Sequence, residues 1–187
     1  MSSNFNHTTR RRFCTLLGSS ALLGIATEGL VSVAQTSPPA ANTDAISILV
    51  DDHRRIEALM NQIAQTPASN PTQRAQLLQQ LLNLLTVHNF TEENLIYPAI
   101  RDIANLPNDA TMLYQQQDQS KVLVFELDQL PKNDDPDWSN RFATFESALL
   151  SHVAQEENVD FPRLRTAVGP KLTELTTKVR QLRSHWS

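Results

Sequence analysis

The strongest constraint on this chain is a stretch that occurs twice, with the shared form H-x-x-x-E-E-N-x-x-x-P-x-x-R. The first copy runs from His88 to Arg101 and the second from His152 to Arg165. On a helix, residues four apart lie one turn apart on the same face, so each histidine and the first glutamate after it can converge on one point. Two such helices that face each other would supply two imidazole nitrogens and two carboxylates to a shared centre.

Apolar residues recur at steps of three and four along four blocks of the chain, which is the spacing of a helix face and not of a strand. Clusters of proline, asparagine and aspartate separate the blocks. A proline in the first turn and an Asn, Asp or Thr cap are typical of helix starts. The four helices are therefore expected to begin near Asp44, Asn70, Pro107 and Asp137.

Residue types that can bind metals interrupt the apolar stripe in three of these blocks. In the first block His53 stands at a stripe position, and the other two interruptions are the histidine–glutamate pairs of the repeated stretch. The stripes predict the following buried residues, block by block: Ile46, Leu49, His53, Ile56, Met60 and Ile63; Leu78, Leu81, Leu85, His88, Glu92 and Leu95; Met112, Leu113, Val122, Leu123, Leu127 and Leu130; and Trp138, Phe142, Phe145, Leu149, His152, Glu156 and Val159.

The predicted fold is all-α, an up-down-up-down four-helix bundle with a short C-terminal fifth helix. A chain of 187 residues, 40% of them hydrophobic, suits one compact domain and is too short for two sizeable cores. The bundle is expected over residues 44–168. Residues 169–187, which begin with Gly169 and Pro170, form an amphipathic segment that is expected to pack across the bundle.

Buried carboxylates need a partner of opposite charge. Burying an ionised glutamate without one is costly, so Glu92 and Glu156 on apolar stripes require neutralisation. A metal cation bound jointly with His53, His88 and His152 would supply it. Carboxylate and imidazole ligands suit iron, manganese or zinc, and helical bundles build dinuclear centres from these residue types on facing helices.

Each histidine or histidine–glutamate pair, taken alone, has a simpler interpretation than metal binding. A lone histidine at a stripe position, such as His53, is more often a hydrogen-bonded core or boundary residue than a ligand. A single H-x-x-x-E is more often a surface or capping pair. The repetition of that pair at the same place in two helices, with His53 at matching depth, favours metal binding.

Residues 1–34 differ in character from the rest of the chain. Three arginines at positions 10–12 precede a weakly apolar run over residues 16–27, and small residues follow at positions 32–34. This order is that of a secretory signal peptide, and the arginine run resembles the twin-arginine type. We therefore expect cleavage after Ala34, a linker over residues 35–43, and a periplasmic or other extracytoplasmic location.

Charge and cysteine content narrow the partners. The net charge is −4, and cleavage would remove three arginines and one glutamate, which leaves a more acidic chain that does not favour nucleic acid. The single cysteine, Cys14, would leave with the signal peptide, so a thiolate metal site is not expected in the mature chain.

An uncleaved membrane anchor is the alternative for residues 1–34. Glu28 and the glycines disfavour it, because a span needs about 20 predominantly apolar residues, and no stable membrane association is expected after cleavage.

The two copies of the motif, together with the first-block histidine, resemble the signature of hemerythrin-like, HHE cation-binding domains over about residues 44–165. The resemblance implies a bundle that holds a non-haem di-iron centre. Members of this family bind dioxygen, sense oxygen or redox state, store iron, or handle nitric oxide and repair iron centres. Carried over by position, the implied ligands are His53 and His88 for one metal, His152 for the other, and Glu92 and Glu156 as bridges.

The third block departs from the family pattern. The family's third helix supplies one histidine, or two spaced by four, and residues 107–130 contain none. Gln119, which follows Asp118, is the preferred counterpart, and Gln115 lies one turn before it. A carboxamide oxygen is a weaker ligand for iron than imidazole, so a modified centre with one or two irons is expected.

Three functional hypotheses remain open. The first is a metal-binding protein used for iron, oxygen or redox sensing, storage or protection. The second is an enzyme whose iron has an open position and acts on peroxide or nitric oxide. The third is a helical module that has lost its metal. Beyond the metal, the expected small-molecule partners are dioxygen, nitric oxide or peroxide.

Overall fold

The computed structural model describes residues 43–133 and 136–186, and within these residues the chain is helical with no strand. The expected signal peptide, and the expected linker apart from Thr43, lie outside the described residues. The elements in order are α1 (Ala45–Gln65), α2 (Pro71–Thr91), η1 (Glu92–Ile96), α3 (Tyr97–Asp102), α4 (Pro107–Gln129), α5 (Pro136–Gln155), η2 (Glu156–Asp160), α6 (Phe161–Val168), η3 (Gly169–Lys171), α7 (Leu172–Arg183) and η4 (Ser184–Trp186).

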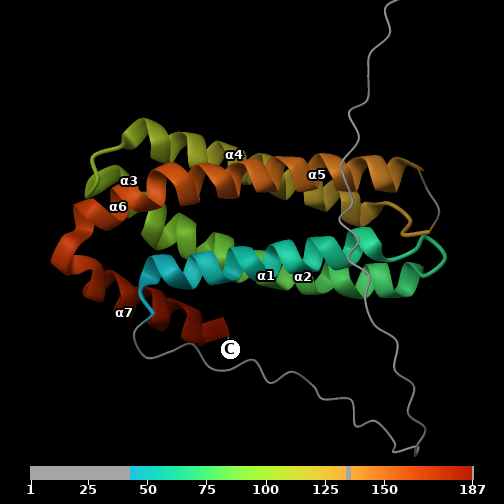
Figure 1. Ribbon diagram of the computed structural model, residues 1–187, viewed down its shortest axis with the longest axis horizontal. Helices are drawn as coiled ribbons and strands as arrows, with labels where there is room; N and C mark the ends of the chain where they lie inside the picture. The colour runs from blue at the N-terminus through green and yellow to red at the C-terminus, as the bar shows by residue number, and fades with distance from the viewer. Residues whose placement is uncertain (1–42, 134–135, 187) are drawn as a thin grey trace, which may run out of the picture. The chain divides into compact units, whose positions relative to one another are not determined.

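The predicted four-helix bundle with a fifth C-terminal helix is confirmed (Figure 1). The segments α2, η1 and α3 run on as one long helix, and α5, η2 and α6 form another. α1 packs along α2, α4 packs along α5, and α7 turns back to lie against α1 and α2. Gly169, with φ of 47°, allows the turn that leads from α6 into α7. None of the helices in the described parts of the chain is both long and apolar enough to cross a membrane.

The helix starts follow from local side-chain chemistry. The carboxylate of Asp44 accepts a hydrogen bond from the backbone N–H of Ser47 at 2.9 Å, and the side chain of Asn70 accepts one from the backbone of Gln73 at 3.2 Å. These caps satisfy N–H groups that have no partner inside the helix. α2, α4 and α5 each begin with proline, which has no such N–H to satisfy.

The apolar stripes bury two separate hydrophobic cores, one toward each end of the bundle. One core contains Leu49, Ile100 and Phe161, and the other contains Ile56 and Phe145. Burying a side chain of this size stabilises the fold by about 1.5–3 kcal/mol. His53 lies between Leu49 and Ile56 on α1, so the polar centre sits between two cores that hold the helices in place on both sides.

Both copies of the repeated stretch widen into a π-helical turn, over Glu92–Ile96 and Glu156–Asp160. The proline that follows each turn has no backbone N–H and would clash with the carbonyl four residues before it in a regular helix. The wider turn removes that conflict and inserts one residue into the helix, which is common at functional sites. It also moves the buried face forward by one, so Ile96 is buried where Leu95 was predicted, and Asp160 where Val159 was predicted.

Candidate metal centre

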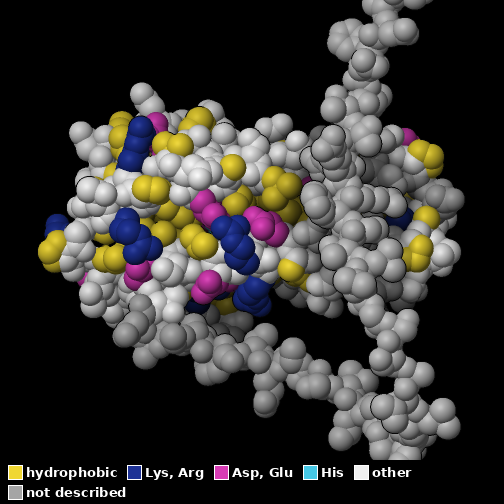
Figure 2. All heavy atoms as spheres, in the orientation of Figure 1, with side chains coloured by type: hydrophobic (Ala, Val, Ile, Leu, Met, Phe, Trp, Pro, Cys, Tyr) yellow, Lys and Arg dark blue, Asp and Glu magenta, His cyan; other side chains and the backbone are white. Residues whose placement is uncertain are grey.

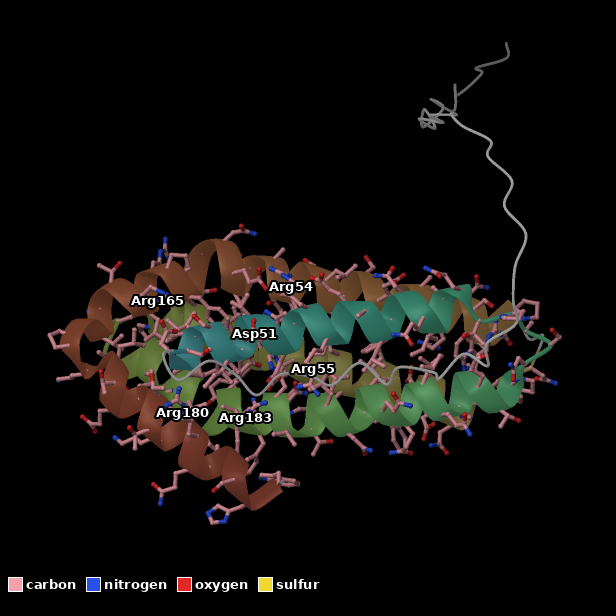
Figure 3. All side chains as sticks on the ribbon, turned by 60° about the horizontal axis from the view of Figure 1, so that its bottom comes forward. Asp51, Arg54, Arg55, Arg165, Arg180 and Arg183 are labelled. Carbon is pink, nitrogen blue, oxygen red and sulfur yellow. The ribbon has the colours of Figure 1, made fainter. Side chains whose placement is uncertain are left out.

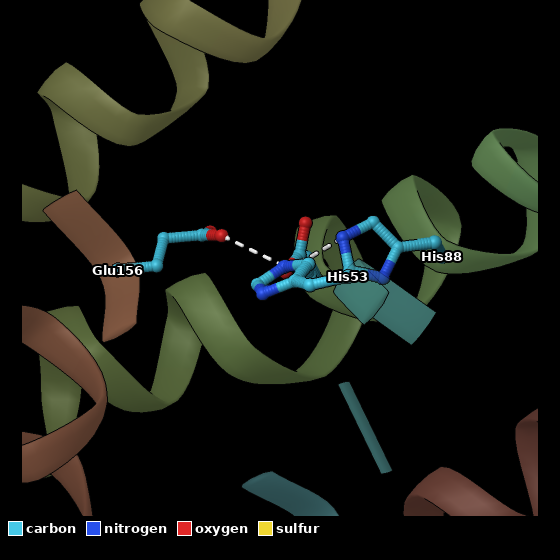
Figure 4. A group of neighbouring side chains, drawn as sticks. His53, His88 and Glu156 are labelled. Atoms are coloured by element: carbon cyan, nitrogen blue, oxygen red, sulfur yellow. Dashed lines mark ion pairs between the residues drawn. The ribbon is translucent and has the colours of Figure 1, made fainter. Parts of the chain in front are cut away.

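Four buried side chains from three long helices converge between the two cores (Figure 4). His53 comes from α1, His88 from α2, Glu92 from η1 and Glu156 from η2, and their ligand atoms all lie within 4.8 Å of one another. Two of the pairs lie close to the separation of about 3.4 Å that bonds of about 2.1 Å impose in a tetrahedral site. His53 Nε2 is 3.3 Å from Glu156 Oε2 and His88 Nε2 is 3.2 Å from Glu92 Oε1. The spacing therefore suits a bound cation.

Three atoms of this cluster are buried and make no hydrogen bond: His53 Nε2, Glu92 Oε1 and Glu156 Oε2. Both glutamate side chains are 0% exposed, so water does not compensate them from outside the bundle. Buried polar atoms without partners are rare in native proteins, and a group of three facing one point calls for a specific explanation. A cation would bind all three at once, and this donor set fits iron, manganese or zinc.

The three histidines share one arrangement, with Nδ1 turned outward toward an oxygen. A histidine that donates from Nδ1 keeps the lone pair of Nε2 for the opposite side, which is how metal-binding histidines are usually oriented. The outward pairs are His53 Nδ1–H donating to Glu157 Oε1 at 2.8 Å, His152 Nδ1–H donating to Gln116 Oε1 at 3.1 Å, and His88 Nδ1 lying 3.5 Å from Asp52 Oδ2. All three Nε2 atoms are thereby available on the glutamate side.

His152 approaches the two glutamates from the side opposite His53 and His88, where the hydroxyl of Tyr97 stands at the centre. This hydroxyl lies 2.9 Å from Glu156 Oε1, 3.1 Å from Glu92 Oε2 and 3.1 Å from His152 Nε2. One phenolic hydrogen therefore faces three acceptors. Each glutamate has one oxygen directed toward His53 and His88 and the other toward Tyr97, so the centre has two distinct sides.

The two copies of the motif differ at the residue before the proline, which is Tyr97 in the first copy and Phe161 in the second. The ring of Phe161 stacks on His53, with ring centroids 5.8 Å apart. Tyr97 meets His152 edge-on at 6.5 Å and adds a hydroxyl that phenylalanine lacks. The pseudo-symmetry of the repeat is therefore broken at the side of the centre that carries His152.

The structure corrects the expected third-helix residue. Gln119 is exposed, as are Gln115 and Asp118, while Gln117 is buried and its Nε2 donates to Glu92 Oε2 at 3.0 Å. Two residues correspond to about 200° around a helix, so Gln117 and Gln119 point to nearly opposite sides. Val122, which was predicted to lie on the buried side of this helix, is likewise 56% exposed.

Charge within the centre shifts the pKa values of its histidines. Burial lowers the pKa of His88, but the charge of Glu92 and the facing Asp52 carboxylate raise it to about 10. Burial also opposes protonation of His53, and the close carboxylates of Glu156 and Glu92 raise its pKa above the ordinary value. Burial instead dominates at His152 and lowers its pKa. The glutamates therefore favour protonation of the His53 and His88 rings in the metal-free protein, and a cation would compete with those protons.

Four residues that contact the centre were not among the predicted ligands: Tyr97, Gln117, Glu157 and Asp52. Glu157, the second glutamate of its motif copy, accepts a hydrogen bond from His53 and pairs with Arg54. Comparison of the two copies position by position exposes the Tyr97–Phe161 difference, and this is the one sequence signal that could have drawn attention to Tyr97. Gln117 is one of three consecutive glutamines, and only the helix register distinguishes it from its neighbours.

Comparisons with known proteins found one solved structure of similar fold and one curated relative in sequence. A crystal structure of a hemerythrin HHE cation binding domain-containing protein from Mycobacterium kansasii has a similar fold, with a TM-score of 0.67 and 23% identity, over 76% of this chain and 86% of that one. A DNA nickase from Nostoc sp. is 25% identical over 123 residues, which are 66% of this chain and 34% of that protein. The chain thus spans about a third of that relative's length.

A family model adds the decisive match, because it covers more than half of the chain. The Hemerythrin HHE cation binding domain matches residues 44–164. This range includes His53, the whole first copy of the repeated stretch, and the second copy up to the residue before Arg165. On this match, this chain belongs to the hemerythrin HHE cation-binding domain family.

Proposed function

We propose that this protein binds non-haem iron between its helices and serves in iron, oxygen or redox sensing, iron storage, or protection. The observation that carries the proposal is the group of three buried atoms without hydrogen-bond partners, contributed by His53, Glu92 and Glu156. Family membership and the buried cluster both indicate metal binding. Iron is the metal that the family resemblance implies, and manganese or zinc would suit the same ligand types.

The residues divide into two sides of one centre. His53 and His88 would hold a cation together with Glu92 Oε1 and Glu156 Oε2, and His152 lies at the other oxygens of the same carboxylates. Bound iron would supply a Lewis-acidic, redox-active ion there. The chain itself orients His53 and His152 through outward hydrogen bonds and places Asp52 behind His88, and the two hydrophobic cores close the centre toward both ends of the bundle.

The Gln117 amide and the Tyr97 hydroxyl stand on the His152 side of the centre, where the family pattern places third-helix histidines. Gln117 Nε2 donates to Glu92 Oε2 at 3.0 Å and to the Tyr97 hydroxyl oxygen at 3.2 Å. Neutral donors in this position compete with a cation for the same carboxylate oxygens. This supports a modified centre in which the His53 side binds metal more tightly than the His152 side.

DNA cleavage, the activity named for the Nostoc relative, finds little support in the surface of this chain. Figure 3 labels arginines of α1, α6 and α7, a residue type that could contact phosphate. All of them but Arg180 pair with carboxylates: Arg54 with Glu57 and Glu157, Arg55 and Arg183 with Asp52, and Arg165 with Asp44. On the face drawn in Figure 2, basic and acidic side chains likewise lie next to one another.

Metal content of the purified protein tests the proposal directly. We expect bound iron, with a visible spectrum, and we expect His88→Ala and His152→Ala each to reduce it because each removes an imidazole at the glutamates. His185→Ala is the matched control, since His185 is exposed on η4. Unchanged iron in both site variants would overturn the assignment, and turnover of peroxide or nitric oxide above that of free iron would favour the enzyme hypothesis.

Stability provides a second readout of the same centre. A ligand that binds only the folded protein stabilises it by about 2.7 kcal/mol when its free concentration is a hundredfold above Kd. Chelation should therefore lower the melting temperature of the wild type and leave that of His88→Ala nearly unchanged. Identical melting of chelated and iron-loaded wild type would support a helical module without metal.

We also propose export of the mature chain, on the arginine run, apolar segment and small residues of positions 1–34. Intact-mass analysis of the exported protein should show an N-terminus near Gln35. Replacement of the arginines at positions 10–12 by lysines should block export through a twin-arginine route. Exported protein that retains residues 1–34 would contradict cleavage.

A further inference from the structure

A cavity of about 390 Å³ opens between α2 and α4, with side chains of α5 at its inner wall. Phe90, Phe125 and Trp186 line it and are exposed by 37%, 65% and 52%, so they mark its mouth. His88, Gln117 and His152 also line it and are at most 3% exposed, so they mark its inner end. The cavity therefore leads from the surface to the side chains that surround the glutamates.

The cavity is much larger than a diatomic gas or a peroxide needs. A water molecule takes about 30 Å³ and an engineered cavity of about 150 Å³ holds benzene, so this volume corresponds to two rings or a medium-length alkyl chain. It falls within the range of small-molecule sites, which are about 300–1,000 Å³. Its walls are mainly apolar, formed by residues such as Leu85, Val124, Phe145 and Leu149.

The polar groups of the lining indicate what kind of head group would fit. The amide nitrogen of Gln117 donates to Glu92, so the other amide atom, Gln117 Oε1, is the acceptor. Gln117 Oε1 is buried and has no hydrogen-bond partner. A ligand that donates a hydrogen bond would satisfy it. The cationic groups of the lining are already paired, Lys121 with Glu93 and Asp118, and His88 with Glu92. An uncharged donor is therefore favoured over a carboxylate.

We propose that this cavity binds an uncharged apolar molecule with one hydroxyl group, an alcohol or phenol of about the size of two rings or a ten-carbon chain. The apolar body lies against the α2, α4 and α5 side chains, and the hydroxyl donates to Gln117 Oε1. Binding requires the cavity and Gln117 but no bound metal. The ligand's polar end would nevertheless lie beside His88 and His152.

Displacement of a fluorescent probe tests the proposal. N-phenyl-1-naphthylamine, an uncharged apolar probe, should bind with increased fluorescence, and 1-decanol should displace it at a concentration at least tenfold lower than decanoate does at pH 8. The measurement is made on zinc-loaded and on chelated protein, because zinc has no visible absorption. Binding in both forms is expected, so failure of metal binding leaves this result readable. Decanoate that displaces as well as decanol would overturn the assignment of an uncharged ligand.

Two substitutions on α4 locate the probe. Val124→Trp fills the cavity and should weaken probe binding at least tenfold, while Val122→Trp introduces the same change at an exposed position outside the lining and should leave binding unchanged. Equal binding by both variants would rule out this cavity. Gln117→Leu should weaken decanol binding about fivefold, the loss expected for one hydrogen bond, and an unchanged affinity would rule out Gln117 as acceptor.

Trp186 provides a measurement that does not depend on the folding of Val124→Trp. The chain has two tryptophans, so Trp138→Phe leaves Trp186 as the single emitter. Because Trp186 lines the cavity, bound probe should quench its emission by energy transfer. Probe binding without quenching in this variant would place the probe elsewhere and overturn the proposal.

Discussion

Arg183 on α7 donates two hydrogen bonds to the buried carboxylate of Asp52 on α1, at 2.6 and 3.1 Å. Asp52 Oδ2 in turn lies 3.5 Å from His88 Nδ1, so the C-terminal helix reaches the candidate metal centre through one carboxylate. The positive charges of His88 and Arg183 hold the pKa of Asp52 below its ordinary value although burial raises it. Carboxylates behind metal-binding histidines commonly set the orientation of the ring.

Removal of Arg183 should therefore weaken both the fold and the centre. Arg183→Met leaves the Asp52 carboxylate without its main partner, and breaking a buried ion pair from one side costs about 3 kcal/mol. We expect a lower melting temperature and a severalfold weaker affinity for iron. Arg180→Met is the control, because Arg180 lies on the same helix and bonds the exposed carbonyl of Thr43; an equal loss in both variants would contradict a specific role for Arg183.

The register of α4 predicts opposite results for two glutamine substitutions. Gln117→His places an imidazole next to Glu92 Oε2 and should raise iron occupancy toward two per chain. Gln119→His places the same group on the exposed side of the helix and should leave occupancy unchanged. Metal analysis together with the absorption of the iron centre measures both. A gain in Gln119→His alone would show that α4 is rotated from the position described here.

The Tyr97 hydroxyl should matter more to the metal-free protein than to the iron-loaded one. Tyr97→Phe reproduces the residue of the second motif copy and removes a donor from two buried carboxylates, at a cost of about 1–3 kcal/mol. Chemical denaturation in the presence of a chelator should show this loss, and iron should reduce it by neutralising the same oxygens. Tyr114→Phe, which removes a hydroxyl bonded to the Glu93 carbonyl, is the control and should respond equally with and without iron.

The raised pKa of His88 predicts that metal binding releases protons. At pH 8 the ring is protonated in the metal-free protein, since its pKa is about 10, and it must lose that proton to bind a cation. Titration calorimetry in buffers of different ionisation enthalpy should show the release, and affinity should rise with pH up to about 10. His88→Ala should release about one proton fewer.

The same shift makes the stability of the metal-free protein depend on pH. The pKa of His88 in the folded state lies above the unfolded value of about 6.5. Its full stabilising contribution to the free energy of unfolding is therefore present below about pH 6.5. It is lost as the pH rises toward 10, with a slope of at most about 1.4 kcal/mol per pH unit. Denaturation curves of chelated protein over this range measure it, and stability that increases with pH would contradict the assignment.

The local pattern of the sequence was sufficient to predict the helices and most of their buried faces. In α1, every predicted stripe residue from Ile46 to Ile63 is buried, because a regular helix of 3.6 residues per turn keeps residues three and four apart on one side. The three histidines and two glutamates were predicted for the same reason. They lie on apolar stripes, where their burial demands a partner, and the structure brings them together.

The tertiary structure decided what helical periodicity cannot encode. The π-helical turns shift the buried face by one residue after Glu92 and Glu156, and no periodic pattern predicts an inserted residue. The rotation of α4, which selects Gln117 over Gln119, depends on how that helix packs against its neighbours, since apolar residues occur on its exposed side as well. The sequence alone therefore determined which side chains need a partner, whereas packing between helices determined that Tyr97, Gln117, Glu157 and Asp52 provide it.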